Sequence, residues 1–221
     1  MASAVSASQI AAREAMIDSQ LKPCGVVSPR VSAAFFAVPR EAFVAAGRRG
    51  LAYVDAPQPL KPGRELLAPL SLGLLVEHAE IQPNDKVLIV GTGSGYSAAI
   101  VSQLSNSVVA LESDSELAAE ARDNLAAYAE VRVVEGPLEK GWAEAAPYSL
   151  ILIDGAVEEL PVELIAQLAE GGRLLAIVVG SDGVSRAAKG IRRAGLLPLE
   201  PFAEAPGAVL PSFGKAPAFQ F

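Results

Sequence analysis

Residues 87–96 read Val87-Leu-Ile-Val-Gly91-Thr-Gly93-Ser-Gly95-Tyr96, and this stretch decides the fold. Four consecutive apolar residues are typical of a buried parallel strand. The glycines that follow indicate a tight turn whose backbone can approach a ligand closely. In open α/β sheets, ligands bind at the carboxyl edge, where such strands end. The stretch therefore predicts a strand that delivers a loop to a nucleotide-like cofactor.

Strand-like and helix-like runs alternate on both sides of this stretch. The predicted strands cover residues 86–90, 108–111, 131–134, 150–153 and 174–179, and predicted helices cover 98–104, 115–128 and 161–168. This alternation predicts βαβ units and a doubly wound α/β sheet of the Rossmann-like type. The pattern leaves residues 184–194 open between a helix and closing strands. A last strand is expected at residues 218–221, and a helix end at Gly171-Gly172.

The first third of the chain has a helical pattern instead. Helices are predicted at residues 8–22 and 70–79, and a third begins at Pro29 with Ser28 as its N-cap. Residues 40–69 are rich in proline and glycine, so we expect irregular structure there, with one short helix at 40–46.

Composition excludes several classes of function. Hydrophobic residues make up 51% of the 221 residues, which is enough for a packed core. The net charge of −7 disfavours a nucleic-acid partner, which would need a basic face. Cys24 and His78 are the only residues of their kinds, so we expect no metal site and no internal disulfide. Without a signal-peptide pattern or an apolar run of about 20 residues, we expect a cytoplasmic protein without membrane contact.

The spacing of the glycine loop narrows the choice of cofactor. Tyr96 stands where a dinucleotide-binding loop would carry its last glycine, which disfavours NAD and FAD. Glu112 closes the next strand and could accept hydrogen bonds from ribose hydroxyls, or could simply be a solvated strand end. Asp154 closes another strand, either as a functional acid or as a turn cap. His78 could be a general base, although a packed ring fits its apolar helix better.

Several stretches resemble the protein-L-isoaspartate O-methyltransferase family. Residues 88–99 resemble its first cofactor motif, and Val38-Pro-Arg-Glu-Ala-Phe-Val44 resembles its VPR-x-x-FV signature. Residues 52–60 resemble its AY-x-D-x-P-x-P stretch. Shorter matches lie at residues 16–21, 141–148 and 171–174, so that the resemblance runs from about residue 12 to 180.

The resemblance implies a fold, a cofactor and a reaction. The fold is a seven-stranded sheet whose last strand is antiparallel, which favours a strand at residues 184–194. The cofactor is S-adenosyl-L-methionine, and the reaction is methyl esterification of isoaspartyl carboxylates in damaged proteins or peptides, for protein repair. We expect one methyltransferase domain over residues 1–221. Within it, residues 1–79 form an N-terminal helical and acceptor-side segment, and residues 80–221 form the cofactor-binding sheet.

The resemblance also implies roles for individual residues. The loop would hold the methionine moiety, Glu112 the ribose, and Glu135-Gly136 the adenine, in place of the Asp-Gly that is usual in the family. Asp154 is added from its strand-end position alone. The predicted cofactor-binding residues are Gly91, Thr92, Gly93, Ser94, Gly95, Glu112, Glu135, Gly136 and Asp154.

One segment departs from the family. The acceptor-side signature G-x-T-I-S-x-P corresponds here to Gly63-Arg-Glu-Leu-Leu-Ala-Pro69. Its serine, the proposed catalytic hydroxyl, is replaced by Leu67, which has no donor. Arg64 could hold an acceptor carboxylate bidentately, with Glu65 as a second contact, or both could be solvated loop residues. No catalytic residue is assigned, and the alternatives are a cofactor-binding homologue without isoaspartyl activity or a methyltransferase with another acceptor.

Overall fold

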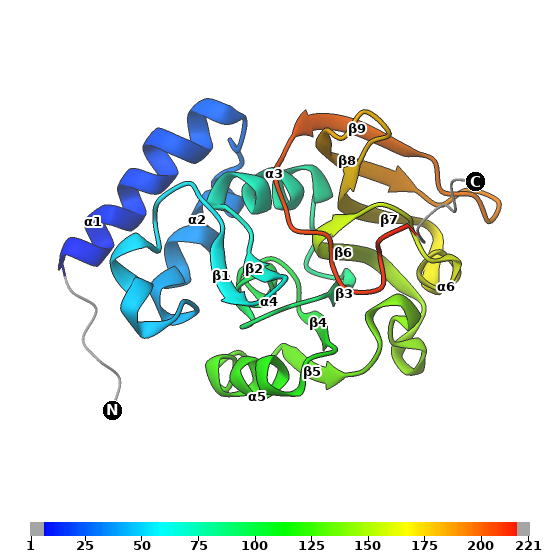
Figure 1. Cartoon of the computed structure of the whole chain (residues 1–221), viewed down its shortest axis with the longest axis horizontal. Helices are drawn as coiled ribbons and strands as arrows, with labels where there is room; N and C mark the ends of the chain where they lie inside the picture. Colours follow the sequence, from blue (N-terminus) through cyan, green and yellow to red (C-terminus); the bar gives the residue numbers. More distant parts are fainter. Residues whose placement is uncertain (1–6, 216–221) are drawn as a thin grey trace, which may run out of the picture.

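A central seven-stranded sheet organises the chain in the computed structural model, which describes residues 7–215. The strands follow the order β5-β4-β3-β6-β7-β8-β9 (Figure 1). The first five strands are parallel, β8 is antiparallel to β7, and β9 is antiparallel to β8. The prediction of a doubly wound, seven-stranded sheet with antiparallel closure is confirmed. The strand bounds are β3 (Lys86–Val90), β4 (Ser107–Glu112), β5 (Val131–Glu135), β6 (Tyr148–Val157), β7 (Leu168–Val179), β8 (Ser185–Ile191) and β9 (Leu199–Glu204).

The end of the sheet differs in part from the predictions. The strand favoured at residues 184–194 is confirmed as β8, whereas β9 lies in a stretch for which no strand was predicted. The strand predicted at residues 218–221 lies outside the described residues. The predicted helix end at Gly171-Gly172 is wrong. The preceding helix already ends at Gln167, because Leu168 has extended backbone angles and begins β7.

The predicted helices are present with shifted ends. Asp114 caps the helix that follows β4, since its side chain accepts hydrogen bonds from the backbone N–H groups of Glu116 and Leu117. Ser28 holds the N-cap position of its helix without a side-chain hydrogen bond. The helices are α1 (Ala7–Met16), α2 (Pro29–Ala37), α3 (Pro69–Ala79), α4 (Tyr96–Ser102), α5 (Ser115–Asn124) and α6 (Val162–Gln167). None of the described helices is long and apolar enough to cross a bilayer.

Alternating side chains of the strands fill two hydrophobic clusters, one on each face of the sheet. Val87 and Ile89 of β3 belong to the cluster that also contains residues from α1 to α4. Leu88 and Val90 point to the other face and pack with Leu164 of α6 and with the C-terminal segment that includes residues 208–213. This period of two over a fully buried strand explains the unbroken apolar run at residues 87–90.

A β-hairpin occupies part of the region that was predicted to be irregular. Strand β1 (Gln58–Lys61) pairs antiparallel with β2 (Arg64–Leu66). Gly63 has a φ of +72°, so the Pro62-Gly63 dipeptide makes the turn. In Figure 1 the hairpin overlaps α4, and hydrogen bonds of Arg64 to Glu112 and to the carbonyl of Gly91 place it at the carboxyl ends of β4 and β3. The short helix expected at residues 40–46 is a 3₁₀ turn over Arg40–Ala42, and a second 3₁₀ segment covers Ala46–Leu51.

At the opposite edge of the sheet, Arg173 of β7 ties several elements together. Its Nη2 lies 2.5 Å from Oδ2 of Asp85, and its Nε donates to the carbonyl of Ala79 at the end of α3. Asp85 also accepts a hydrogen bond from the hydroxyl of Ser149, next to β3 and β6. Removing one partner would leave the other charge largely desolvated.

We expect Arg173→Gln to lower the free energy of unfolding by about 3 kcal/mol, because it breaks a mostly buried ion pair. Arg186→Gln is the control, since Arg186 pairs with Asp182 at the solvent-exposed surface; its expected loss is below about 1 kcal/mol. Urea unfolding followed by circular dichroism measures both. Equal losses in the two variants would contradict the anchoring role of Arg173.

Candidate active site at the carboxyl edge of the sheet

The glycine loop between β3 and α4 is held close to other parts of the chain. Gly91, Gly93 and Gly95 have φ values of +80°, +56° and +100°. A Cβ atom at residue 93 would lie 2.7 Å from Cδ1 of Leu60, and one at residue 91 would lie 2.8 Å from Cδ1 of Leu210. The loop therefore requires glycine for its conformation and its packing, and side chains from β1 and from the C-terminal segment cover it.

Glu112, at the end of β4, is the most fully bonded side chain of the site. Its carboxylate accepts hydrogen bonds from both terminal nitrogens of Arg64, each at 2.5 Å, and from the backbone N–H of Gly93 at 2.8 Å. The N–H groups of Ser113 and Asp114 donate to Oε1 at 2.8 and 3.0 Å. The side chain is fully buried. The alternative of a solvated strand end is therefore wrong.

Arg64 lies over the glycine loop. Besides Glu112, its Nη2 donates to the carbonyl of Gly91 at 3.2 Å, and its Nε is buried without a partner among the described residues. Glu65 accepts a hydrogen bond from the N–H of Ala208 at 2.8 Å and ties the hairpin to the C-terminal segment. Neither residue is a solvated loop residue. In this structure Arg64 faces the predicted ribose acid, and its contact with an acceptor stays a prediction.

A second cation fixes the hairpin at the same edge. Nζ of Lys61 lies 2.9 Å from Oδ1 of Asp114 and 2.5 Å from Oε2 of Glu116, at the start of α5. Lys61 of β1 thus attaches the hairpin to the start of α5, and Arg64 of β2 attaches it to the end of β4. The sequence analysis did not identify this hairpin, although Pro62-Gly63 is a recognisable turn signal.

A groove of about 420 Å³ opens beside the predicted adenine residues. Glu135 is half exposed and lies 3.5 Å from Arg122, and the N–H of Gly136 donates to the carbonyl of Glu112. The residues present fit S-adenosyl-L-methionine, because a glycine loop, an acid suited to the ribose and an open groove are adjacent to one another. The glycine loop, which is predicted to hold the methionine moiety, is covered by Leu60, Arg64 and Leu210. The groove is lined by Ser113, Glu135, Gly136, Pro137, Leu138, Glu139, Pro211 and Ser212.

The other loop residues serve mainly to hold the loop. The Ser94 hydroxyl donates to the carbonyl of Phe43 at 2.7 Å, and the Asn124 amide donates to the carbonyl of Ser94 at 3.0 Å. The Thr92 hydroxyl is buried without a partner among the described residues. A buried hydroxyl without a partner costs free energy, so Thr92 is the loop side chain best placed to bond a ligand.

Asp154 lies where β6 loses its regular pairing with β7, between Leu152 and Ala156. Only 8% of the residue is exposed. Burial raises the pKa of Asp154 to about 6, and the guanidinium groups of Arg64 and Arg40 act in the opposite direction. The position brings Asp154 to the same edge as the glycine loop and Glu112. A carboxyl group that titrates near neutral pH is typical of functional sites.

Tyr96 connects the N-terminal segment to the glycine loop. Its ring packs against Phe43 at 5.5 Å between centroids, and the Arg40 guanidinium lies 4.9 Å from the ring centroid. Arg40 donates to the carbonyls of Ala52 and Leu67, both at 2.7 Å. Burial raises the pKa of Tyr96 to about 12, so the ring stays neutral. The sequence analysis used Tyr96 only to exclude a dinucleotide, and the only hint of this role was an aromatic residue at a glycine position.

Leu67 is part of the hydrophobic core. Only 1% of the residue is exposed, and its Cδ2 would lie 3.1 Å from a Cβ atom at residue 207. The position therefore supplies packing and a backbone carbonyl for Arg40, and it supplies no hydroxyl donor.

The signature residues outside the glycine loop hold the N-terminal segment in place. Tyr53 donates a short hydrogen bond to Glu41 and accepts one from Nε of Arg13 at 2.8 Å. Oδ1 of Asp55 accepts a hydrogen bond from the N–H of Leu70, in the first turn of α3. These contacts are structural, and they position the hairpin and α3 around the site.

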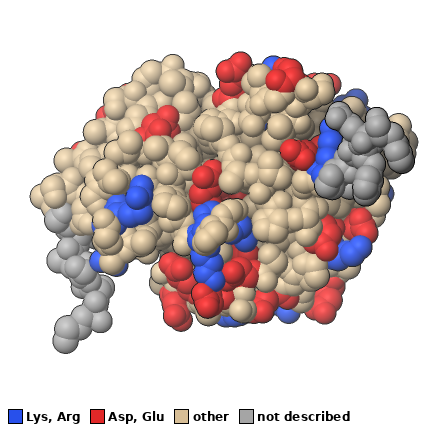
Figure 2. Space-filling model, viewed as in Figure 1, with Lys and Arg blue, Asp and Glu red and all other residues tan. Residues whose placement is uncertain are grey.

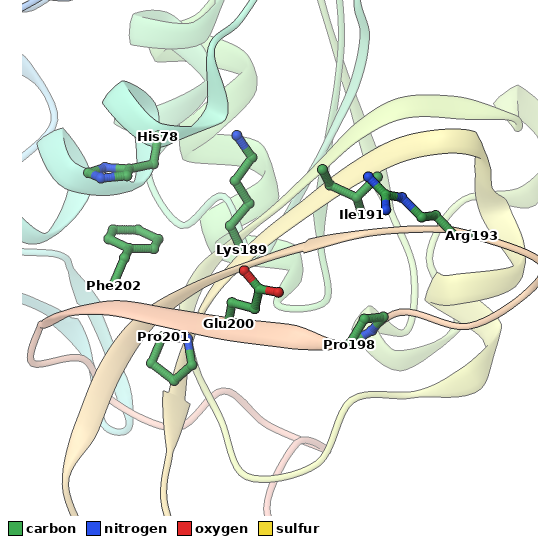
Figure 3. Close-up of a pocket in the computed structure, with 8 residues that line it drawn as sticks. All are labelled: His78, Lys189, Ile191, Arg193, Pro198, Glu200, Pro201 and Phe202. Atoms are coloured by element: carbon green, nitrogen blue, oxygen red, sulfur yellow. The ribbon is translucent and has the colours of Figure 1, made fainter.

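His78 lies at the other edge of the sheet. It lines a groove of about 430 Å³ between the end of α3 and strands β8 and β9 (Figure 3). Its ring stacks on Phe202 with 3.9 Å between centroids, and its Nδ1 lies 3.0 Å from the carbonyl of Leu74. The packed alternative therefore describes His78.

Comparison with known proteins assigns the family. A model of the family described as protein-L-isoaspartate(D-aspartate) O-methyltransferase matches residues 11–195. The chain belongs to this family. It is 41% identical over 185 residues to protein-L-isoaspartate O-methyltransferase 2 of Pelobacter propionicus, which covers 83% of this chain and 82% of the relative. It is 38% identical over 168 residues to protein-L-isoaspartate O-methyltransferase of Methanoculleus marisnigri, with 75% and 76% covered.

Solved structures agree with this assignment. A protein-L-isoaspartate O-methyltransferase structure matches with a TM-score of 0.78 and 25% identity, and covers 90% of this chain and 65% of its own. The structure of a β-aspartate methyltransferase from Plasmodium falciparum in complex with S-adenosyl-L-homocysteine matches with a TM-score of 0.76. At 18% identity, with 91% and 97% covered, this second likeness shows the fold alone. S-adenosyl-L-methionine, predicted from the sequence, is the methyl donor of the family.

We expect Asp154→Asn to stabilise the protein at pH 8 more than at pH 4.5. The pKa of Asp154 is raised from 3.8 to about 6 in the folded protein. The folded state therefore binds more protons between these values, and the contribution of Asp154 to stability is lost as the pH rises through about 6. The variant removes this loss, which is on the order of 3 kcal/mol at most.

Thermal melts at the two pH values measure the effect. Asp182→Asn is the control: Arg186 lowers the pKa of the exposed Asp182 from 3.8 to about 2, so this residue changes its contribution to stability only below pH 4.5, and the effect of the variant should be the same at both pH values. If Asp154→Asn changed the melting temperature equally at both pH values, the raised pKa of Asp154 would be contradicted.

Proposed function

We propose that this protein is an enzyme that transfers the methyl group of S-adenosyl-L-methionine to the isoaspartyl carboxylate of damaged proteins or peptides. One observation carries the proposal. In a chain of this family, the glycine loop, the buried Glu112 and the groove at Glu135-Gly136 lie side by side at the carboxyl edge of the sheet. This is where open α/β sheets bind their ligands.

We assign the predicted cofactor residues to three parts of the site. Residues 91–95 hold the methionine moiety, Glu112 accepts hydrogen bonds from the ribose, and Glu135 with Gly136 borders the adenine. Asp154 limits the site on the side of β6. When bound, the cofactor supplies an electrophilic methyl group on a sulfonium. The protein itself aligns a carboxylate oxygen with that methyl group and excludes water, so that a C–O bond forms as the C–S bond breaks.

We also propose that residues 1–221 work as one domain in the cytoplasm. Lys61 and Arg64 form ion pairs with Asp114 and Glu112. These pairs support a single site built from both parts of the chain, with residues 1–79 on the acceptor side and residues 80–221 on the cofactor side. Cys24 is a free, exposed thiol, which is typical of a reducing compartment. Over the described residues of one face, Figure 2 shows acidic and basic side chains mixed rather than a continuous basic surface, which supports a protein substrate over nucleic acid.

We expect base-labile methyl ester to form when the protein is incubated with labelled cofactor and an isoaspartyl peptide. The same peptide with a normal aspartyl linkage is the substrate control and should stay unlabelled. Equal labelling of both peptides would contradict the proposed specificity. Cofactor binding without any ester at saturating concentrations would contradict the proposed reaction.

Glu112→Gln tests the cofactor side separately. The variant keeps the shape of the side chain but loses its charge, so we expect the dissociation constant of S-adenosylhomocysteine to rise by about tenfold to a hundredfold. Calorimetry measures it, with a thermal melt to show that the variant is folded. An unchanged dissociation constant would remove Glu112 from the ribose site.

A further inference from the structure

The hydrogen-bonding capacity of Glu112 is fully used before any ligand arrives. A carboxylate has about four acceptor positions. Here five N–H donors already converge on it, two from Arg64 and three from the backbone of Gly93, Ser113 and Asp114. A ribose diol can bind Glu112 only when some of these donors leave. The backbone donors belong to the loop and to the start of α5, so Arg64 is the partner that can be exchanged.

The guanidinium of Arg64 also occupies the space that a ligand on the loop needs. It bridges Glu112 and the carbonyl of Gly91, between two leucines that cover the loop. Its long side chain projects from β2, a strand of three residues whose Leu66 packs into the hydrophobic cluster that also contains residues from α1 to α4, while the guanidinium itself makes only polar contacts. Movement of this side chain therefore leaves the sheet and both hydrophobic clusters intact.

A displaced guanidinium needs another anion nearby. The side chain of Arg64 is 6% exposed, and an unpaired charge at this depth is strongly disfavoured. The other carboxylates at this edge already have partners: Asp114 and Glu116 pair with Lys61, and Glu65 accepts a hydrogen bond from the N–H of Ala208. Asp154, on β6, already interacts with Arg40 of the N-terminal segment, whose own positive charge repels a second guanidinium. An incoming acceptor carboxylate supplies the planar, bidentate partner that Arg64 loses.

We propose that Arg64 exchanges carboxylates during the reaction. It pairs with Glu112 in the free protein, is displaced when the ribose binds Glu112, and then holds the acceptor carboxylate. The inference rests on the proposed function and adds the residue that recognises the acceptor. In this inference the guanidinium of Arg64 binds the acceptor carboxylate, whereas Leu67, which replaces the family's serine, has no hydrogen-bond donor for it. It also sets an order, because the acceptor finds its partner free only after the cofactor has bound.

Calorimetry on the wild-type protein tests this order. We expect an isoaspartyl peptide to bind at least tenfold more tightly when the protein is saturated with S-adenosylhomocysteine. A peptide in which that carboxylate is amidated should show no such gain. Equal affinity of the isoaspartyl peptide with and without S-adenosylhomocysteine would overturn the exchange, and so would an equal gain for the amidated peptide.

Variants of the two hairpin cations test the residue itself. Arg64→Gln should raise the KM for the isoaspartyl peptide at least tenfold without raising the dissociation constant of S-adenosylhomocysteine, because the competitor for Glu112 is removed. Arg64→Lys keeps the charge but loses the bidentate contact, so its KM should lie between those of Arg64→Gln and wild type. Lys61→Gln is the matched control on the same hairpin: it weakens the attachment of the hairpin but removes no contact of Glu112, so it should raise the peptide KM much less than Arg64→Gln does.

The outcomes separate this inference from the proposed function. If both affinities weaken together in Arg64→Gln, with an equal effect in Lys61→Gln, the hairpin cations are structural only and the exchange is wrong. If Arg64→Gln does not fold, the exchange is still tested by the calorimetry on the wild-type protein, which compares peptide affinity with and without S-adenosylhomocysteine. Failure of the wild-type protein to bind S-adenosylhomocysteine would refute the proposed function. Normal ester formation with peptide affinity independent of S-adenosylhomocysteine would refute only the exchange.

Discussion

The buried ion pair between Arg64 and Glu112 is the interaction on which the site depends. It joins the β1–β2 hairpin to the end of β4, and the same carboxylate holds the N–H of Gly93 in the glycine loop. Burying two charges is costly, and the cost is offset here by bidentate geometry and by three further backbone donors. The pair therefore sets the position of the hairpin and the shape of the loop at the same time.

A site organised in this way binds ligands by exchange of partners. In the free protein the loop is covered by the side chains of Leu60, Arg64 and Leu210, while the groove beside Glu135 is open. Under the proposed assignment, the adenine end of the cofactor would have direct access to the groove, and the methionine end would have to displace protein side chains. The glycine loop is therefore already shielded from solvent by these side chains, and such shielding favours reactions that need water to be excluded.

The family signatures outside the loop act through packing. Arg40 supports Ala52 and Leu67 by hydrogen bonds to their carbonyls, Tyr53 joins Arg13 and Glu41, and Asp55 binds the start of α3. Together with the ring of Tyr96, these residues fix the N-terminal segment against α4. Family signatures outside the glycine loop thus serve here to hold the N-terminal segment beside that loop.

The sequence by itself determined the sheet, the glycine loop and the strand ends that carry Glu112 and Asp154, because buried strands and glycine turns have local patterns. It did not reveal the hairpin, whose strands of four and three residues are too short for a periodic signal. Nor could it pair Arg64 with Glu112, which are 48 residues apart. Only the tertiary structure decided that contact, because the partner of a buried charge depends on which strand ends meet in space.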